Sequence, residues 1–176
     1  MMKSYLEIQV PIRYDAKWFQ KLRAVCRHIP VKWQMGYYHI TMTFLDETPV
    51  DVDLQPILDR HLATLSAPVI AFDKLDAFTA TSGMCIIHLT ATVIPQDFQE
   101  TIEVIRADLK AIGCRIESDF RLHVTLGRVK DVNISLSDIQ ESISSVDFPA
   151  FSLCLTDVDY REFRGKLLYE TILKRQ

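Results

Sequence analysis

The sequence lacks the short patterns that mark several widespread kinds of enzyme. Its 176 residues contain no phosphate-binding glycine loop, no G-x-S-x-G turn for a nucleophilic serine and no dinucleotide fingerprint. It also lacks closely spaced cysteines, so no disulfide framework and no Cys/His metal site is indicated. We therefore expect no cofactor, a reducing cytoplasmic location and four buried free thiols, at Cys26, Cys85, Cys114 and Cys154.

An excess of positive charge is missing as well. Twenty Lys and Arg stand against 23 Asp and Glu, which gives a net charge of −3. A protein that holds long nucleic acid is usually basic, because it must neutralise the phosphates. We therefore expect no long nucleic acid as a partner, but a small nucleotide or a short RNA end in a local basic pocket.

Long hydrophobic runs are absent too. No apolar segment reaches membrane-spanning length, and residues 1–11 show no charged-then-apolar layout of a signal segment. We expect no membrane partner. A hydrophobic content of 48% with 24% charged residues is typical of a folded globular domain, so we interpret residues 1–176 as one domain with a sizeable core.

Two segments carry a His-x-Thr pattern. Residues 38–44 read Tyr-His-Ile-Thr-Met-Thr-Phe. Side chains of a strand alternate between its faces, so His39, Thr41 and Thr43 are predicted to share one face. The opposite face is apolar and can be buried, with Ile40, Met42 and Phe44.

The second segment, residues 122–128, reads Leu-His-Val-Thr-Leu-Gly-Arg. His123 and Thr125 are predicted to share a face, and Arg128 follows just beyond a glycine. The two motif histidines are 123 − 39 = 84 residues apart. This spacing makes the pair the main functional clue in the sequence.

The same spacing recurs along the chain, which indicates an internal duplication. Pro11 and Pro95 are also 84 residues apart, and Pro68 and Pro149 are 81 apart. We predict an α+β fold with two similar lobes, each an antiparallel sheet with helices on one face, and a central cleft between them. The lobes are placed at about 3–80 and 84–160, with a closing strand at 166–173. Because helices can cover one face of each sheet, we expect a monomer.

Local periodicity gives the expected elements. Apolar residues that recur every three or four positions predict helices, and alternating residues predict strands. Ser135 with Asp138 resembles a capping box, and Asp15 and Asp53 are candidate helix caps. The expected helices are 15–29, 54–65, 98–112 and 135–146; the expected strands are 5–10, 39–45, 69–78, 84–93, 122–128, 151–160 and 166–173.

Two imidazoles that face one another suit phosphoryl chemistry. A neutral histidine can take a proton from the attacking water, while a protonated one gives a proton to the leaving oxygen. A threonine hydroxyl can donate to a phosphate oxygen, and Arg128 can bind the same group through its planar fork. A metal site is the alternative, in which both histidines join Asp46, Glu47 or Asp119, although threonine is a poor ligand and no metal-type spacing occurs.

The remaining histidines are less informative. His88 lies in a third His-x-Thr, but it occupies a different place in the repeat, so we interpret it as a sheet residue that could line the cleft. His28 ends a predicted helix, where a positive charge suits the helix dipole, and His61 lies on a helix surface. We expect both of these to be structural.

At this point the sequence resembles a known group. Residues 39–45 and 123–128 look like the two signatures of the 2H phosphoesterases, and within them the 2′-5′ RNA ligase / RNA 2′,3′-cyclic phosphodiesterase family (LigT-like). The resemblance implies a two-lobed fold and metal-independent opening of a 2′,3′-cyclic phosphate to a 2′-phosphate. It implies that His39 and His123 are the acid/base pair and that Thr41 and Thr125 orient the phosphate.

The resemblance also implies 2′-5′ ligation or cleavage in some members, and a substrate-binding arginine that Arg128 would match. Tyr38, which precedes the first motif histidine, is a second candidate for substrate binding besides Arg128. Two departures bear on the substrate: Asp46 replaces a usual glycine, and Gly36-Tyr37-Tyr38 replaces a polar approach. From the two motifs and this resemblance we expect an enzyme. The alternative is a nucleotide-binding module of the same fold that lacks turnover.

Overall fold

A computed structural model describes all residues, 1–176. Four helices and ten strands follow one another along the chain. None of the helices has both the length and the apolar content that a membrane crossing requires. The elements are β1 (Met2–Gln9), α1 (Lys17–Val25), β2 (Val31–Trp33), β3 (His39–Thr48), α2 (Gln55–Leu62), β4 (Val69–Phe72), β5 (Lys74–Thr79), β6 (Cys85–Thr90), α3 (Gln96–Ala111), β7 (Val124–Val129), α4 (Leu136–Ser144), β8 (Phe151–Cys154), β9 (Asp157–Glu162) and β10 (Leu167–Ile172).

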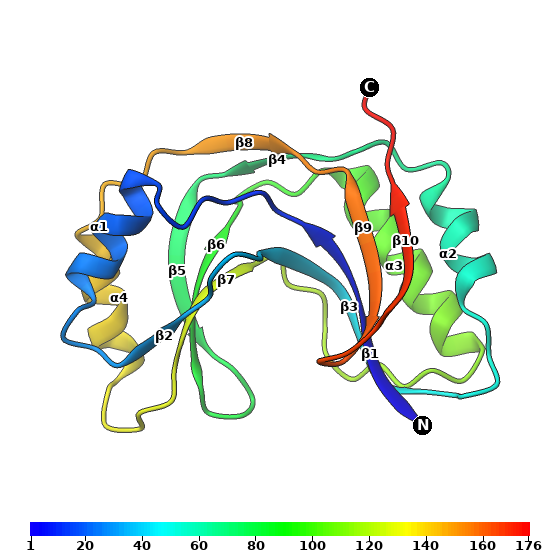
Figure 1. Cartoon of the computed structure of the whole chain (residues 1–176), viewed down its shortest axis with the longest axis horizontal. Coiled ribbons are helices and arrows are strands. Elements are labelled where there is room, and N and C mark those ends of the chain that lie inside the picture. Colours follow the sequence, from blue (N-terminus) through cyan, green and yellow to red (C-terminus); the bar gives the residue numbers. More distant parts are fainter.

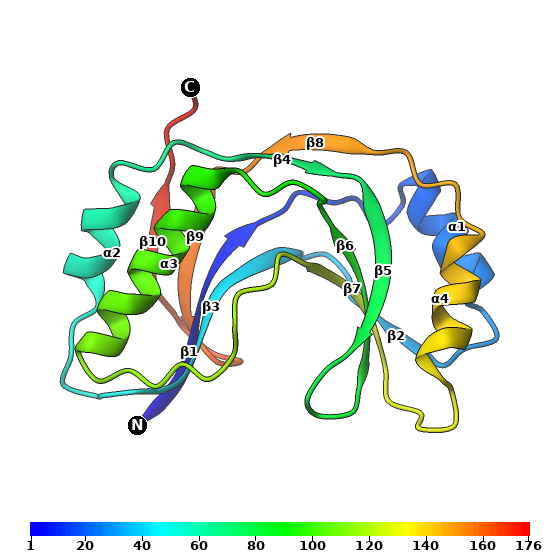
Figure 2. The same ribbon diagram turned by 180° about the vertical axis from the view of Figure 1, so that it is seen from behind.

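One large antiparallel sheet runs through the molecule in the order β10-β9-β1-β3-β7-β6-β5, and β2 pairs with β7. Helices α2 and α3 pack together at one end, and α1 and α4 pack together at the other (Figure 1). The short strands β4 and β8 pair with each other and run between the two ends, as the view from behind also shows (Figure 2). The α+β class with antiparallel sheets is thus confirmed.

The order of strands in the sheet has the symmetry of a duplication. The first half contributes β1, β3 and β5, and the second half contributes β6, β7 and β9 in equivalent places. Within the sheet, six strands have the order β9-β1-β3-β7-β6-β5. If each strand is replaced by its equivalent from the other half (β1 by β6, β3 by β7 and β5 by β9, and the reverse), the same order is obtained, read backwards. The two motif strands, β3 and β7, are the central pair.

The halves of the chain nevertheless do not fold as separate lobes, which corrects the predicted boundaries at 3–80 and 84–160. Strand β9 of the second half pairs with β1 of the first, and β5 of the first half pairs with β6 of the second. Helix α1 likewise packs against α4, and α2 against α3. Each spatial lobe therefore contains elements of both halves, because the last strand of each half crosses to the other one.

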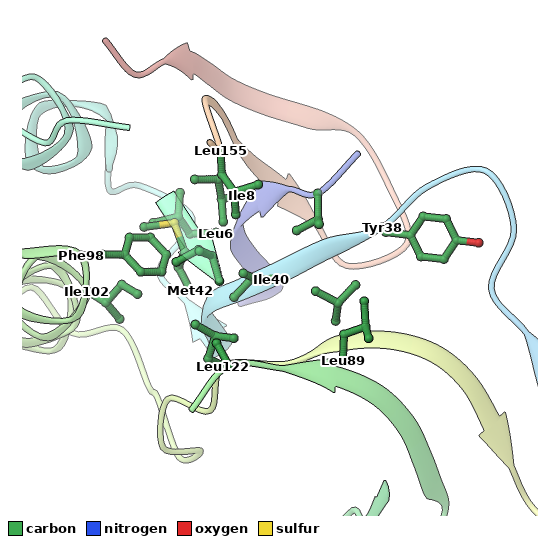
Figure 3. Close-up of a cluster of buried hydrophobic side chains, with 14 of the residues drawn as sticks. Leu6, Ile8, Tyr38, Ile40, Met42, Leu89, Phe98, Ile102, Leu122 and Leu155 are labelled. Atoms are coloured by element: carbon green, nitrogen blue, oxygen red, sulfur yellow. The ribbon is translucent and has the colours of Figure 1, made fainter. Parts of the chain in front are cut away.

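The core lies between the helices and one face of the sheet. Helix α3 buries an apolar stripe that recurs every three or four residues, with Phe98, Ile102, Ile105 and Leu109. Figure 3 shows Phe98 and Ile102 directed toward Met42 of the first motif strand. At roughly 25 cal/mol per Å² of buried apolar surface, contacts of this kind hold the motif strands firmly in place.

Element ends follow local chemistry only in part. Ser135 caps α4, where its Oγ accepts a hydrogen bond from the Asp138 amide at 3.1 Å, as predicted. Asp15 does not cap α1, which begins after Ala16 without a side-chain cap. Asp53 lies one position before the cap of α2, although its Oδ1 accepts from the Gln55 amide at 3.0 Å. The predicted strands 69–78 and 151–160 are each split in two.

Candidate active site

The two motifs meet on the open face of the sheet. Strands β3 and β7 are antiparallel with Ile40 opposite Val124, and both of these side chains are fully buried in the core. Their neighbours must point to the other face. His39 therefore lies across from Thr125, and Thr41 lies across from His123. In such a pair, diagonal neighbours are on the order of 7–8 Å apart, which is the separation expected for the two histidines.

A bulge brings Arg128 to the same face. Strand β6 pairs His88 with Thr125 and Ile86 with Arg128, so β7 uses one residue more than β6 over this stretch. Thr125 and Arg128 consequently share a face although they are three positions apart. The Arg128 guanidinium is half-buried, and its Nη1 donates a hydrogen bond to Oε1 of Gln34 at 3.0 Å.

Gly127 makes this bulge possible. A Cβ at this position would lie 2.5 Å from Cγ1 of Val31 and 2.9 Å from Cε3 of Trp33 on strand β2. These contacts are too short for any side chain. The glycine of the second motif therefore serves the close approach of β2, which pairs with β7 and presents Trp33 directly opposite it.

His123 is anchored by the backbone and surrounded by aromatic and basic side chains. Its Nδ1 lies 3.0 Å from the carbonyl oxygen of Arg121 and donates to it, which leaves Nε2 as an acceptor in the neutral ring. The Phe78 ring is 5.3 Å away, edge-on, and the Arg121 guanidinium lies over that ring at 4.2 Å. Burial, with help from Arg121 and Arg128, lowers the pKa of His123.

His88 also belongs to this side of the site. Its ring centroid is 5.9 Å from that of His123, and the residue is only 6% exposed. Burial lowers the pKa of His88 to about 4, and the neighbouring His123 contributes to the shift. The neutral His88 ring thus packs against His123 and lines the site. His88 is therefore the sheet residue expected from the sequence.

His39 has a different environment. Its Nε2 lies 3.5 Å from Oε2 of Glu7, and its ring stacks on Tyr5 with centroids 6.0 Å apart and contacts Tyr37 at 5.2 Å. Burial lowers the pKa of His39 to about 4, and the charges of His123 and the neighbouring arginines act in the same direction. The ring is therefore neutral at pH 7 unless an anion approaches.

Glu7 is connected to further charged groups on β9. Its Oε1 accepts a hydrogen bond from Nε of Arg161 at 3.2 Å, and Arg161 also donates to Asp159 at 2.9 Å. Gln9 donates to the same Asp159 carboxylate at 2.7 Å. A polar network thus extends from His39 across β1 to β9.

A groove opens beside His123, on the side away from Glu7. It has a volume of about 590 Å³ and lies between the β5–β6 hairpin and helix α3. Nη1 of Arg106 donates to the Thr43 hydroxyl at 3.2 Å within it. We call it the His123 groove; its lining includes Thr41, Phe44, Phe78, Arg106, Arg121 and His123.

Three expectations about the first motif are wrong. Tyr38 is only 3% exposed and packs in the core, and its hydroxyl donates to the Gln34 carbonyl at 2.7 Å, so its side chain is not free to bind a substrate. Thr43 does not share the face of His39, because a register shift pairs Thr41 with Glu7 but Thr43 with Leu6, a core residue. Phe44, expected in the core, is instead partly exposed and lines the His123 groove.

Two of the three acidic residues considered as metal ligands have other partners. Asp46 accepts a hydrogen bond from the Glu117 amide at 3.0 Å, and Glu47 forms an ion pair with Arg115 at 3.1 Å. Asp119 lines the His123 groove. The chain contains no group of three or more His, Cys, Asp or Glu side chains arranged to hold a metal ion.

Sequence reasoning missed Glu7, Arg161 and Arg121. The alternation in β1 places Tyr5, Glu7 and Gln9 on one face, and a carboxylate in the middle of such a strand was the available signal. Nothing local connects Arg161 to this strand, because it arrives through the crossover pairing of β9 with β1. Arg121 precedes the second motif by two residues, in a segment without regular structure.

Comparisons with known proteins find similar chains. The family model described as LigT like Phosphoesterase matches residues 93–162, which include the second motif. An RNA 2′,3′-cyclic phosphodiesterase of Archaeoglobus fulgidus is 28% identical over 129 residues, which are 73% of this chain and 68% of that protein.

Solved structures share the fold over the full length. TT0787 of Thermus thermophilus is 18% identical with a TM-score of 0.66, and the match covers 99% of this chain and 100% of that one. LigT of E. coli, solved with 3′-AMP, is 18% identical with a TM-score of 0.61 and 99% coverage of both chains. The resemblance of this chain to the LigT-like 2H phosphoesterases is therefore confirmed, by the family model over residues 93–162 and by the fold along the whole chain.

Proposed function

We propose that this protein is a metal-independent phosphodiesterase that opens 2′,3′-cyclic phosphates to 2′-phosphates, with His39 and His123 as its acid/base pair. One observation carries the proposal. The pairing of Ile40 with Val124 sets the two His-x-Thr motifs side by side in opposite directions, so that each histidine faces the other motif's threonine. A phosphate between them would meet one imidazole and one hydroxyl from each strand.

The reaction needs one proton removed and one supplied. A neutral imidazole takes a proton from the attacking water, the water oxygen bonds to phosphorus, and the bond from phosphorus to the ribose 3′ oxygen breaks. The other imidazole, protonated, gives its proton to that leaving oxygen. The lowered pKa values of His39 and His123 favour the neutral form in the free enzyme, and an incoming phosphate, being negative, would raise them.

The threonines and Arg128 would hold the phosphate during these steps. Hydroxyl groups of Thr41 and Thr125 can donate to its non-bridging oxygens, and the Arg128 guanidinium adds a bidentate positive charge. The charge of Arg128 acts on both His39 and His123, which supports a place beside the same phosphate.

The substrate we propose is a nucleotide or short RNA that ends in a cyclic phosphate. The His123 groove offers the Phe78 ring for stacking and the Arg106 and Arg121 guanidiniums for a second phosphate. The name of the Archaeoglobus relative, an RNA 2′,3′-cyclic phosphodiesterase, supports this class. Joining or cleaving of 2′-5′ bonds would use the same groups, with a ribose hydroxyl in place of water.

The test is turnover in the presence of EDTA. The protein is incubated with the four 2′,3′-cyclic nucleotides and with short RNAs that end in a cyclic phosphate, and the products are separated by chromatography. We expect 2′-phosphates and no 3′-phosphates. Binding of these compounds without any product would instead favour the nucleotide-binding module, and a strict need for a divalent cation would favour the metal-site alternative.

A further inference from the structure

Glu7 is a buried carboxyl group next to the first motif histidine. It lies on β1, where it pairs with Thr41 on one side and Asp159 on the other. Its side chain has no exposure to solvent. One oxygen, Oε1, accepts a hydrogen bond from Arg161, and the other, Oε2, faces Nε2 of His39 at 3.5 Å. A buried carboxylate is costly unless both oxygens have partners, so the second oxygen calls for a proton or a donor.

The polar atoms without partners are all concentrated here. Three buried side-chain atoms in the chain lack a hydrogen-bond partner: Oε2 of Glu7, Nδ1 of His39 and the hydroxyl of Tyr37. The Tyr37 and His39 rings are in contact, so the three atoms form one cluster. Unsatisfied buried groups are rare in folded proteins, and a catalytic role is one reason for which they are kept. None of them lies on the His123 side of the site.

Burial favours the protonated form of Glu7. The row across the sheet continues from Glu7 to Asp159, and beyond it to Glu170 on β10. Burial raises the pKa of Glu7 to about 7, against the lowering effect of Arg161 and with a smaller contribution from the charge of Asp159. Burial lowers the pKa of His39 to about 4. Between about pH 4 and pH 7 the Glu7–His39 pair therefore holds about one proton between its two groups.

His123 has no such partner. Its Nδ1 is fixed by the Arg121 carbonyl, and the charges that act on it are the positive ones of Arg121 and Arg128. Burial, together with these charges, lowers the pKa of His123 and so leaves the Nε2 lone pair available. The two histidines hold equivalent places in the repeat, but only His39 has an acidic group, Glu7, beside it that can supply a proton.

We propose that Glu7 is a positioning residue that shares one proton with His39, so that His39 is the proton donor of the reaction and His123 the acceptor. The inference rests on the proposed function for its chemical meaning. When the substrate phosphate arrives, its negative charge draws the shared proton from Glu7 Oε2 onto His39 Nε2. His123 then takes the proton of the attacking water, and His39 gives its proton to the 3′ oxygen as the bond to phosphorus breaks.

Other titratable or charged groups also face the pair, and the test must separate their effects. They come from β1 itself, from the segment before β3, from the second motif and from β9. They are Tyr5, Tyr37, His123, Arg128, Asp159 and Arg161. The variants of this test, at Glu7 and Glu170, leave His123, Arg128, Asp159 and Arg161 unaltered, so the contributions of these four residues stay constant.

The decisive variant is Glu7→Gln, which keeps the shape and removes the proton site. General acid catalysis would persist with His39 alone, so kcat at pH 7 should fall by no more than the roughly 10²–10⁴-fold expected when an acid/base group is lost. The alkaline limb of kcat/KM should move from near pH 7 toward acid. The largest shift expected is about three pH units, because the pKa values are about 7 for Glu7 and about 4 for His39.

Two controls separate this role from general charge and shape. Glu170→Gln removes a carboxylate from the same sheet face, on the exposed strand β10, without contact to His39, and should leave the limb in place. Glu7→Asp keeps a carboxyl group and should retain the limb near its original pH, with a lower kcat from the shorter reach. An alkaline limb that stays unchanged in Glu7→Gln would overturn the proposal.

NMR gives a readout that does not depend on turnover. In the unaltered protein, the ¹³C signal of the Glu7 carboxyl and the ¹⁵N signals of His39 should titrate together near pH 7. In Glu7→Gln, the His39 signals should titrate only near pH 4. Independent titration of the two residues in the unaltered protein would refute proton sharing, even if the variant failed to fold. An inactive protein with joint titration would refute the proposed function and leave this pairing intact.

Discussion

The two halves of the site share a motif but not a setting. The His39 half, on β1, β3 and β9, is rich in carboxylates and contains the three unsatisfied buried atoms. The His123 half, on β5, β6 and β7, is aromatic and basic, with its histidine fixed by a backbone carbonyl. In the proposed mechanism, the two histidines hold equivalent places in the repeat, and the residues around them make His39 the proton donor and His123 the acceptor. The comparison also predicts how the proposed substrate is oriented: the negatively charged remainder of a short RNA is favoured on the basic His123 side.

Removing either histidine should have the largest effect. His39→Ala and His123→Ala should each lower kcat by roughly 10²–10⁴-fold, because each removes one acid/base group. The double variant should be hardly worse than either single one, since the two groups act as a unit. Steady-state rates on a cyclic nucleotide measure this. Strictly multiplicative losses would argue against a concerted pair.

The threonines should matter less, and about equally. Thr41→Ala and Thr125→Ala each remove one hydrogen bond to a charged phosphate oxygen, which contributes about 1.5–3 kcal/mol. The loss should appear in kcat/KM, and Thr→Ser in either motif should restore most of it. An effect at only one of the two positions would show that the phosphate is not held symmetrically between the motifs.

The alternation of residues around the motifs is enough to predict this pair, because a buried Ile40 and Val124 force their neighbours to the open face. The bulge at Leu126–Gly127 and the register shift beside Met42 cannot be predicted, since each depends on the partner strand. For the same reason the sequence pattern puts Phe44 in the core, whereas Tyr38 follows the alternation and is buried on the face of Ile40. From the sequence, Glu7 is recognised only as part of a half-buried strand. Its partner Arg161 is 154 residues away, so the contact between them cannot be seen in the local pattern.

Arg128, on β7, acts on both motif histidines and should affect every substrate alike. Arg128→Lys keeps the charge and loses the planar fork, at a cost on the order of 1 kcal/mol, and Arg128→Ala should lose more. The ratio of kcat/KM for a cyclic mononucleotide and a short cyclic-ended RNA should remain constant in both variants. A selective loss on the longer substrate would place Arg128 on a neighbouring phosphate, in the His123 groove.

Tyr38 should have the smallest effect. Tyr38→Phe removes the hydrogen bond to the Gln34 carbonyl, so the free energy of unfolding should fall by about 0.5–1.5 kcal/mol, measured by urea denaturation. KM should not change, because the ring lies in the core and not in the site. A raised KM with unchanged stability would restore the sequence-based assignment of Tyr38 to substrate binding.

The pH–rate profiles of the two histidine variants test the central claim most directly. The unaltered enzyme should give a bell-shaped kcat/KM profile, with an acid limb below pH 6.5, because the pKa of His123 is lowered, and an alkaline limb near pH 7 from the Glu7–His39 pair. A base must be unprotonated and an acid protonated, so residual activity of His123→Ala should lose the acid limb and that of His39→Ala the alkaline limb. Loss of the opposite limbs, or identical profiles in both variants, would contradict the division of labour between the two halves.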